Sequence, residues 1–351
     1  MIDPDKQASR PKVSVIVPVY NGEKTLEPSI RSLCDQKDVA LEIILINDAS
    51  TDATGRLIDA LAKDHPCIIP VHLTANGGAH EARLKGLEYV RAPWVGFLDA
   101  DDFARPYMFS TLLKAAQRED VDIVICGLAR VDASREVIGT KVHFHCEQRI
   151  ESDIFARFCQ SEFGVGSLNN KLYRRDLLLP CRDLQFPWRQ NVGEDLVFNL
   201  DCFRRARAVF LLPDILYEYV VNPESVTSVM TRDQARKYVE IFRAFALALK
   251  ALPDRDAHLR TLIVDLYRHR FEFDAFRLPS SADLNLYEEE LAEAEELIHS
   301  IAPTALANLA LRPPLARANQ PIRKRLFRGV TVEFSPGISR RLRGWFQRPK
   351  L

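Results

Sequence analysis

Residues 13–126 alternate between short runs of aliphatic and β-branched residues and longer stretches with helical spacing. The apolar runs are bounded by Asn, Asp and Gly, which favour turns, and they predict buried strands. Between them, apolar residues recur every three or four positions, as on one face of a helix. The expected strands are 13–20, 41–46, 67–73, 94–98 and 122–126, and the expected helices are 23–34, 54–64, 79–90 and 106–119. This alternation predicts an α/β, Rossmann-like fold with a mostly parallel sheet flanked by helices.

Polar turns follow four of the predicted strands. They are residues 20–21, 48–52, 76–78 and 99–102. In open parallel sheets, ligands bind beyond the carboxyl ends of the strands, so these turns are expected to meet at one site. No GxGxxG follows the first strand and no GxxxxGK[ST] occurs, which disfavours a dinucleotide site or a P-loop.

The fourth strand runs directly into Asp99, Asp101 and Asp102. Residues two apart on an extended chain point to the same side, so Asp99 and Asp101 are expected to project together. Two carboxylates this close repel each other, and Mg²⁺ or Mn²⁺ would relieve the repulsion, because these ions use one or two carboxylates together with substrate phosphate oxygens. An acidic turn without a metal is the simpler alternative.

A second acidic pair, Glu194-Asp195, follows Gly193 at the start of an apolar helical stretch. Acids stabilise helix N-termini, and this alone would explain one of them. The alternative is chemical, since a carboxylate here is suited to take a proton from a hydroxyl group as general base.

Beyond residue 127 the regular alternation ends. Strands are expected at 141–145 and 208–212, and a helix at about 152–160. Lys171, Arg174 and Arg175 form a basic segment that would either neutralise a phosphate or lie as a solvated turn, and both interpretations stay open.

The last third of the chain predicts an α-helical C-terminal appendage with an acidic helix at 283–301. Residues 312–351 are strongly basic with interleaved aromatic side chains. This composition predicts contact with an anionic membrane surface or docking onto the acidic helix, and the two alternatives are left open. The expected divisions are a leader (1–10), a catalytic domain (11–230, in halves 11–127 and 128–230), the appendage (231–311) and the basic tail (312–351).

Composition narrows the class of protein. The chain has 351 residues, 47% hydrophobic residues and a formal net charge of zero, so no overall field favours nucleic acid, for which no recognition motif occurs either. Its seven cysteines are scattered without a CxxC pair, which predicts reduced thiols. Together with the polar N-terminus, this favours a cytoplasmic protein, peripheral on the inner face of the cytoplasmic membrane if the tail binds lipid.

Three ordered motifs, at 15–21, 46–52 and 97–102, resemble the nucleotide-sugar half of glycosyltransferase family 2, which has the GT-A fold. The similarity covers roughly residues 11–230. The resemblance implies Asp101 as the metal ligand, Asp195 as catalytic base and Glu194 as a supporting acceptor ligand. It also implies a set of side chains that bind the nucleotide-sugar, namely Pro18, Tyr20, Asn21, Asp48, Arg83 and Asp99.

The expected function is that of a metal-dependent inverting glycosyltransferase, with Mg²⁺ or Mn²⁺ as cofactor. It would transfer a sugar from a nucleotide-diphospho-sugar donor, a UDP-sugar, to a saccharide or lipid-linked acceptor in surface polysaccharide synthesis. A sugar nucleotidyltransferase is one alternative, although the turn at 20–23 lacks the Gly-rich basic loop usual in that class. A non-catalytic nucleotide-sugar-binding protein is the other.

Overall fold

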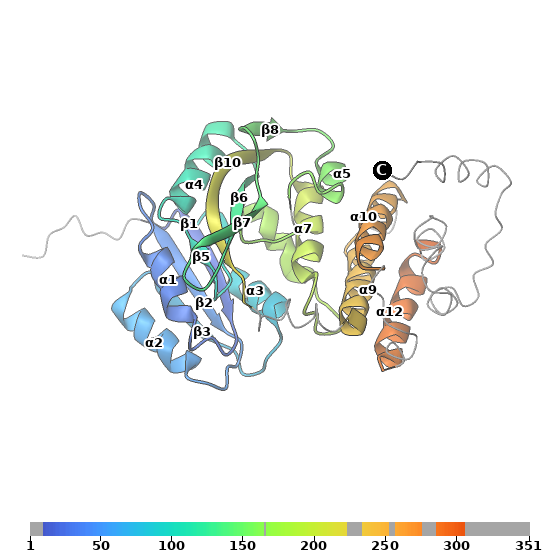
Figure 1. Ribbon diagram of the computed structural model, residues 1–351, viewed down its shortest axis with the longest axis horizontal. Coiled ribbons are helices and arrows are strands. Elements are labelled where there is room, and N and C mark those ends of the chain that lie inside the picture. The colour runs from blue at the N-terminus through green and yellow to red at the C-terminus, as the bar shows by residue number, and fades with distance from the viewer. Residues whose placement is uncertain (1–9, 165, 223–233, 253–256, 276–285, 306–351) are drawn as a thin grey trace, which may run out of the picture.

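The computed structural model describes residues 10–164, 166–222, 234–252, 257–275 and 286–305 (Figure 1). Residues 1–9 of the expected leader and the basic tail at 312–351 lie outside these ranges, so what was expected of them stays a prediction. The domain divisions likewise stay predictions. No described helix is long and apolar enough to cross a lipid bilayer.

The predicted alternation of strands and helices is confirmed in the first half of the chain. The elements are β1 (Val13–Val19), α1 (Leu26–Cys34), β2 (Leu41–Asn47), α2 (Thr54–Asp64), β3 (Ile68–His72), α3 (Ala79–Leu87), β4 (Trp94–Phe97), β5 (Phe103–Ala104), α4 (Met108–Glu119) and β6 (Ile123–Val131). Strands β1, β2 and β4 are almost entirely buried, which explains why they read as continuous apolar runs rather than alternating ones.

The second half differs from the expectation in three places. Its elements are β7 (Val137–Val142), β8 (Gln148–Ile150), α5 (Ile154–Cys159), β9 (Lys171–Arg174), α6 (Arg175–Leu178), the 3₁₀ helix η1 (Leu179–Asp183), α7 (Glu194–Arg205) and β10 (Val209–Val220). The strand expected at 141–145 is wrong, because β7 ends at Val142. β10 runs eight residues beyond the expected end at 212. The basic segment at 171–174 is itself a strand, β9.

The sheet order is β3-β2-β1-β4-β9-β6-β10-β5, with β7 on β6 and β8 on β10. Strands β3, β2, β1 and β4 are parallel to one another, as predicted. β9 is inserted antiparallel between β4 and β6, so the second half of the sheet is mixed rather than mostly parallel. The carboxyl ends of β1, β2 and β4 therefore share one edge, opposite the edge where β9 ends.

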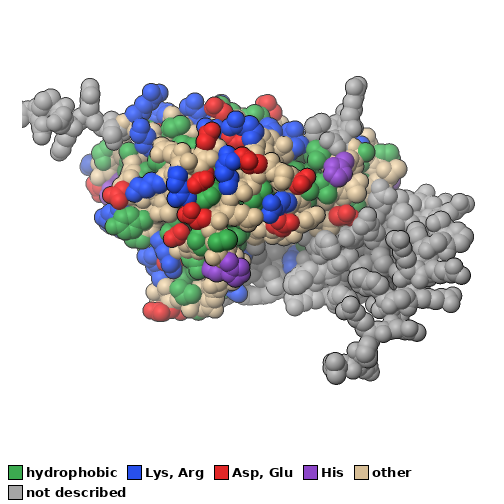
Figure 2. All heavy atoms as spheres, turned by 90° about the horizontal axis from the view of Figure 1, so that it is seen from above, with side chains coloured by type: hydrophobic (Ala, Val, Ile, Leu, Met, Phe, Trp, Pro, Cys, Tyr) green, Lys and Arg blue, Asp and Glu red, His purple; other side chains and the backbone are tan. Residues whose placement is uncertain are grey.

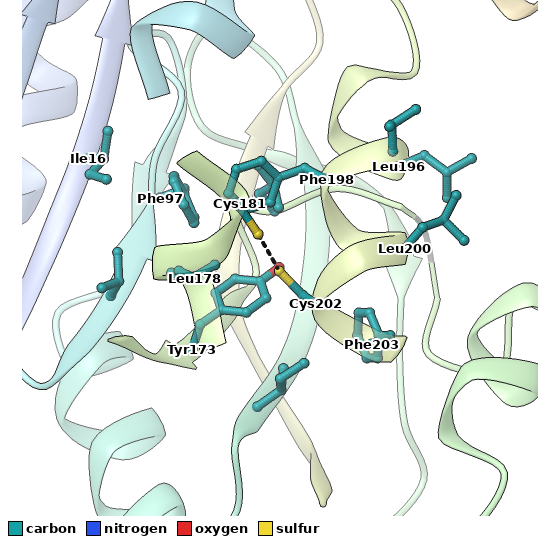
Figure 3. Packing of buried hydrophobic residues seen from close by; sticks show 14 of the residues in the cluster. Ile16, Phe97, Tyr173, Leu178, Cys181, Leu196, Phe198, Leu200, Cys202 and Phe203 are labelled. Carbon is teal, nitrogen blue, oxygen red and sulfur yellow. Dashed lines mark hydrogen bonds between the residues drawn. The ribbon is translucent and has the colours of Figure 1, made fainter. Parts of the chain in front are cut away.

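A continuous apolar core holds α7 against this sheet (Figure 3). The ring of Phe198 on α7 meets Phe97 of β4 edge-on, with centroids 5.8 Å apart, and Tyr173 of β9 contacts Phe97 in the same way at 5.9 Å. Cys181 and Cys202 bring their Sγ atoms to 3.7 Å in this layer, yet all seven cysteines are free, as predicted. The packing fixes where the N-terminus of α7 lies relative to the end of β4.

The appendage comprises α9 (Gln234–Lys250), α10 (Ala257–Ala275) and α12 (Glu288–Ile301), with α9 packed against α7 and against both other helices. α12 is the predicted acidic helix, and two arginines of α9 form ion pairs with its glutamates. Arg236 bonds Glu290 at 2.7 Å and Arg243 bonds Glu293 at 2.9 Å. On the face seen in Figure 2, acidic and basic side chains are interspersed over the described surface.

Candidate active site

Arg83 is the centre of an ion-pair cluster at the carboxyl ends of the strands. Its side chain is 4% exposed and projects from α3. Nη2 donates to Asp99 Oδ1 at 2.9 Å, Nη1 donates to Asp195 Oδ1 at 2.7 Å, and Nη1 lies 3.5 Å from Glu194 Oε1. One buried cation thus joins the loop after β4 to the first turn of α7, and the two acidic motifs predicted from sequence form a single site.

The cluster holds more negative than positive charge. Burial opposes the charged form of Arg83, but Asp195, Asp99 and Glu194 together raise the pKa of its guanidinium. Burial raises the pKa of Glu194 to about 7, and the neighbouring Asp195 adds to that rise. Burial also raises the pKa of Asp195, against the opposing effect of Arg83. One guanidinium among three carboxylates leaves a net negative site that favours a cation or a proton.

Asp101 is the acid in this region best placed to receive a metal ion. Burial, with the charge of Asp99, raises the pKa of its carboxyl group to about 6. Asp99, by contrast, is occupied by Arg83 and by Asn169, whose Nδ2 donates to Oδ2 at 2.6 Å. Within the described ranges no three His, Cys, Asp or Glu side chains form a complete metal cage. A lone, electrostatically uncompensated carboxylate fits an ion that takes its other ligands from phosphate and water.

Asp102, which the sequence showed only as the third acid of its turn, supports the loop. It is buried, and it accepts hydrogen bonds from the Tyr217 hydroxyl and from the backbone N–H of Val220, the latter at 2.8 Å. Burial raises the pKa of its carboxyl group well above the ordinary value. The two bonds tie the end of β10 over the acidic loop, and the length of β10 beyond residue 212 is what makes them available.

Asp48 holds the loop between β3 and α3. Its two carboxylate oxygens accept the backbone N–H groups of Gly77 and Gly78, each at 2.8 Å. Gly78 has φ +87°, a left-handed conformation that side chains rarely adopt, so glycine is required there. The expected contact of Asp48 with a nucleotide base stays a prediction, and the structure adds a role in shaping that wall of the site.

The turn after β1 is joined to the turn after β2. Asn21 has φ +51°, its Oδ1 accepts the N–H of Thr51 at 2.8 Å, and its own N–H donates to Ser50 Oγ at 3.0 Å. Tyr20 beside it is 47% exposed at the carboxyl edge. Pro18 lies within β1, paired with Ile46, and is partly exposed. The nucleoside-pocket residues expected from sequence therefore lie on the same edge as Arg83.

Of the basic segment, only Lys171, at the start of β9, lies towards this edge, where its charge acts on Asp195. Lys171 is fully buried, and its Nζ donates to the Ser167 carbonyl and to Asn170 Oδ1. Arg174 bonds Asp122 at 3.0 Å and lies opposite Trp94, at the start of β4 rather than its end. Neither the phosphate interpretation nor the solvated-turn interpretation holds for Lys171 or Arg174, since their partners lie within the protein.

The loop that leads into Glu194 and Asp195 is held by the appendage. Glu240 of α9 is fully buried, and it accepts the backbone N–H of Asn191 at 3.1 Å and the Nδ2 of Asn191 at 3.3 Å. Gln190 donates to the backbone carbonyl of Glu240 at 2.8 Å. Arg236 Nη2 donates a 2.7 Å hydrogen bond to Glu240 Oε1. The helical appendage therefore contributes to the position of the second acidic motif.

Glu240→Ala is expected to destabilise the protein by about 1.5–3 kcal/mol and to lower turnover of any reaction that uses Asp195, because it removes charge-assisted hydrogen bonds from a buried group. Urea unfolding and steady-state kinetics would measure the two effects. Glu240→Gln, which can still accept from Asn191, should lose less of both. Wild-type stability and turnover in the alanine variant would contradict this role for Glu240.

Comparisons with known proteins show what this chain is similar to. Residues 14–179 match the sequence model of the family described as Glycosyl transferase family 2. The uncharacterized glycosyltransferase EpsJ of Bacillus subtilis is 34% identical over 229 residues, which are 62% of this chain and 64% of EpsJ. The chain thus spans slightly less than two thirds of that relative.

Two solved structures share the fold. The Staphylococcus aureus TarS fragment 1–349 in complex with UDP-GlcNAc superposes with a TM-score of 0.66 at 20% identity, over 90% of this chain and 89% of that one. TarS is named as a poly(ribitol-phosphate) β-N-acetylglucosaminyltransferase. The mannosyltransferase PcManGT of Pyrobaculum calidifontis in complex with GDP-Man and Mn²⁺ gives a TM-score of 0.51 at 19% identity, over 90% of this chain and 86% of its own.

Proposed function

We propose that the protein transfers a sugar from a UDP-sugar to a saccharide or lipid-linked acceptor in surface polysaccharide synthesis, because residues 14–179 match the model of Glycosyl transferase family 2. The observation that carries the proposal is the bridging of Asp99 and Asp195 by Arg83, which joins a donor-side loop to an acceptor-side helix. The UDP-GlcNAc complex of TarS supports the donor class. The polymer in the name of TarS supports a polymeric acceptor.

The proposed reaction is a single displacement with inversion. An acceptor hydroxyl oxygen attacks the anomeric carbon, the bond to the diphosphate breaks, and the hydroxyl proton passes to the carboxylate of Asp195. Burial makes that carboxylate more basic than an ordinary aspartate, because it raises its pKa. Arg83 holds the carboxylate in place, and Asn169 and Arg83 together fix Asp99 beside the donor. Mg²⁺ or Mn²⁺ held by Asp101 would stabilise the negative charge of the diphosphate.

Incubation of the protein with labelled UDP-sugars, Mn²⁺ and a lipid-linked acceptor tests the proposal against its two alternatives. Transfer of label to the acceptor supports it. Formation of the nucleotide-sugar from sugar phosphate and UTP, with release of pyrophosphate, would instead indicate a sugar nucleotidyltransferase. Binding of UDP-sugar without either reaction would indicate a non-catalytic binding protein. A lipid-linked acceptor would lie at a membrane surface. Contact of residues 312–351 with an anionic membrane surface remains a prediction from their composition.

Asp101→Asn is expected to abolish transfer and to remove the Mn²⁺ dependence of UDP binding, because Asn keeps the shape of Asp101 but loses its charge. Calorimetric titration of UDP with and without Mn²⁺ measures the second effect independently of activity. Asp120→Asn is a matched control, since Asp120 is an exposed acid that pairs only with Arg174 among the residues described. Equal Mn²⁺ dependence in the Asp101 variant and in wild type would exclude Asp101 as the ligand.

A further inference from the structure

Lys141 is the extra residue of a β-bulge between β6 and β7. In this antiparallel ladder Val142 lies opposite Leu128 and Thr140 lies opposite Ala129, so Lys141 has no partner of its own. A bulge bends the strand and changes the direction in which its side chain points, and bulges are over-represented beside active sites. The side chain of Lys141 is therefore aimed differently from that of a regular strand residue.

The ammonium group of Lys141 reaches across β6 to β10. Its Nζ lies 4.2 Å from the centre of the Tyr219 ring, in cation–π contact. The residue after Tyr219 is Val220, whose N–H donates to Asp102 in the acidic loop. The side chain of Tyr217 also donates to Asp102, and Tyr217 and Tyr219 lie two apart on one face of β10, so the contact with Tyr219 places Lys141 on the face that meets Asp102.

Lys141 is exposed and forms no ion pair with any residue in the described ranges, although it faces several acids. Partial burial of the ammonium group lowers the pKa of Lys141, while the charges of Asp102, Asp99 and Asp195 raise it. Arg130, which lies opposite Tyr219 in the β6–β10 ladder, adds a second positive charge that acts on Lys141. Lys141 and Arg130 thus place two positive charges close enough to the acids of the site for their charges to interact.

We propose that Lys141, with Arg130 beside it, binds the diphosphate of the sugar donor. The proposal rests on the proposed function and names the residue that contacts the leaving group. Val220, at the end of β10, carries no charge, and the bulge in β7 places the ammonium group of Lys141 beside that end of the strand. The negative charges of a diphosphate would pair with the ammonium of Lys141 and the guanidinium of Arg130.

Calorimetry with UDP and with UMP, each with Mn²⁺, tests the proposal on the full chain. Lys141→Gln should weaken UDP binding by about 10- to 100-fold, the range expected when one charge-assisted hydrogen bond is removed. UMP binding should weaken much less, because the second phosphate is missing. Lys141→Arg should restore most of the UDP affinity, since it retains the charge. Arg130→Gln should weaken UDP binding in the same direction by a smaller factor.

Lys63→Gln is the matched control, because Lys63 is an exposed lysine in the last turn of α2 and its loss changes the net charge equally. UDP affinity in Lys141→Gln equal to that of wild type would overturn the proposal while leaving the proposed function intact. An equal loss for UDP and UMP would also overturn it, since the defect would then lie in the nucleoside pocket. Failure of wild type to bind UDP at all would instead count against the proposed function itself.

Discussion

Asp195→Asn should lower the turnover number by roughly 10²–10⁴-fold, the usual contribution of a general base, while UDP affinity stays within a few-fold of wild type. Asparagine fills the same space and can still accept the 2.7 Å bond from Arg83, so the cluster keeps its shape. Only the proton acceptor is removed. Steady-state kinetics with UDP-sugar and acceptor, beside calorimetry with UDP and Mn²⁺, separates the chemical step from donor binding.

Glu194→Gln is the matched control for the base. It should affect turnover less and the acceptor KM more. A binding contact that is lost equally from the ground state and the transition state raises KM alone. The variant should leave the acidic limb of the pH–rate profile close to that of wild type. Burial and the charge of Asp195 raise the pKa of Glu194 to about 7, so Glu194 is already neutral where Asp195 ionises and its change to Gln removes no charge there. A dead Glu194 variant beside an active Asp195 variant would exchange the two roles, and activity in both would leave the pair as a helix cap.

Arg83→Met is expected to destabilise the protein by about 3–5 kcal/mol at pH 8 and to abolish transfer, because it leaves carboxylates of Asp99, Asp195 and Glu194 close together without their buried partner. The destabilisation should shrink as pH falls towards about 4, the ordinary range of carboxyl pKa values, since protonated acids no longer repel. Urea unfolding measured across this pH range tests both the size and the sign of the effect.

Arg31→Met provides the comparison for that experiment. Arg31 makes an exposed ion pair with Glu27 on α1, and such pairs contribute little to stability. Its removal should therefore change unfolding only slightly at any pH. If Arg83→Met were as stable as Arg31→Met at pH 8, the cluster would not depend on its central cation, and the bridge between the two halves of the site would have no energetic role.

Much of the first half of the fold follows from local patterns. The strands β1, β2 and β4 are buried on both faces, so nearly all of their residues are apolar. Burial of this kind can therefore be recognised from the sequence alone. The bounds of α2 at Thr54–Asp64 agree with the prediction for the same reason, because the spacing of Ile58 and Leu61 records which face is covered. The ordered motifs also indicated the family whose model matches residues 14–179.

The second half required the tertiary structure. A short strand such as β9 has no periodicity long enough to distinguish it from a turn, and its antiparallel place between β4 and β6 depends on pairing with distant residues. The same holds for the bulge at Lys141. It exists only in the pairing of β7 with β6, where β7 contributes one more residue than β6. Register is a property of two strands together, and neither strand alone encodes it.

By itself, the sequence predicted which residues are candidates for the chemistry, namely the acids after β4, the acids at the start of α7 and the arginine on α3. Only the packing of α3, β4 and α7 decided that Arg83 joins Asp99 to Asp195, an acid 112 positions along the chain from the arginine. It also decided that Asp48 holds the Gly77–Gly78 loop and that Glu240 anchors the segment before Glu194. The physical reason is that hydrophobic periodicity reports which face of an element is buried, whereas an ion pair depends on where two separate elements are brought together by the whole core.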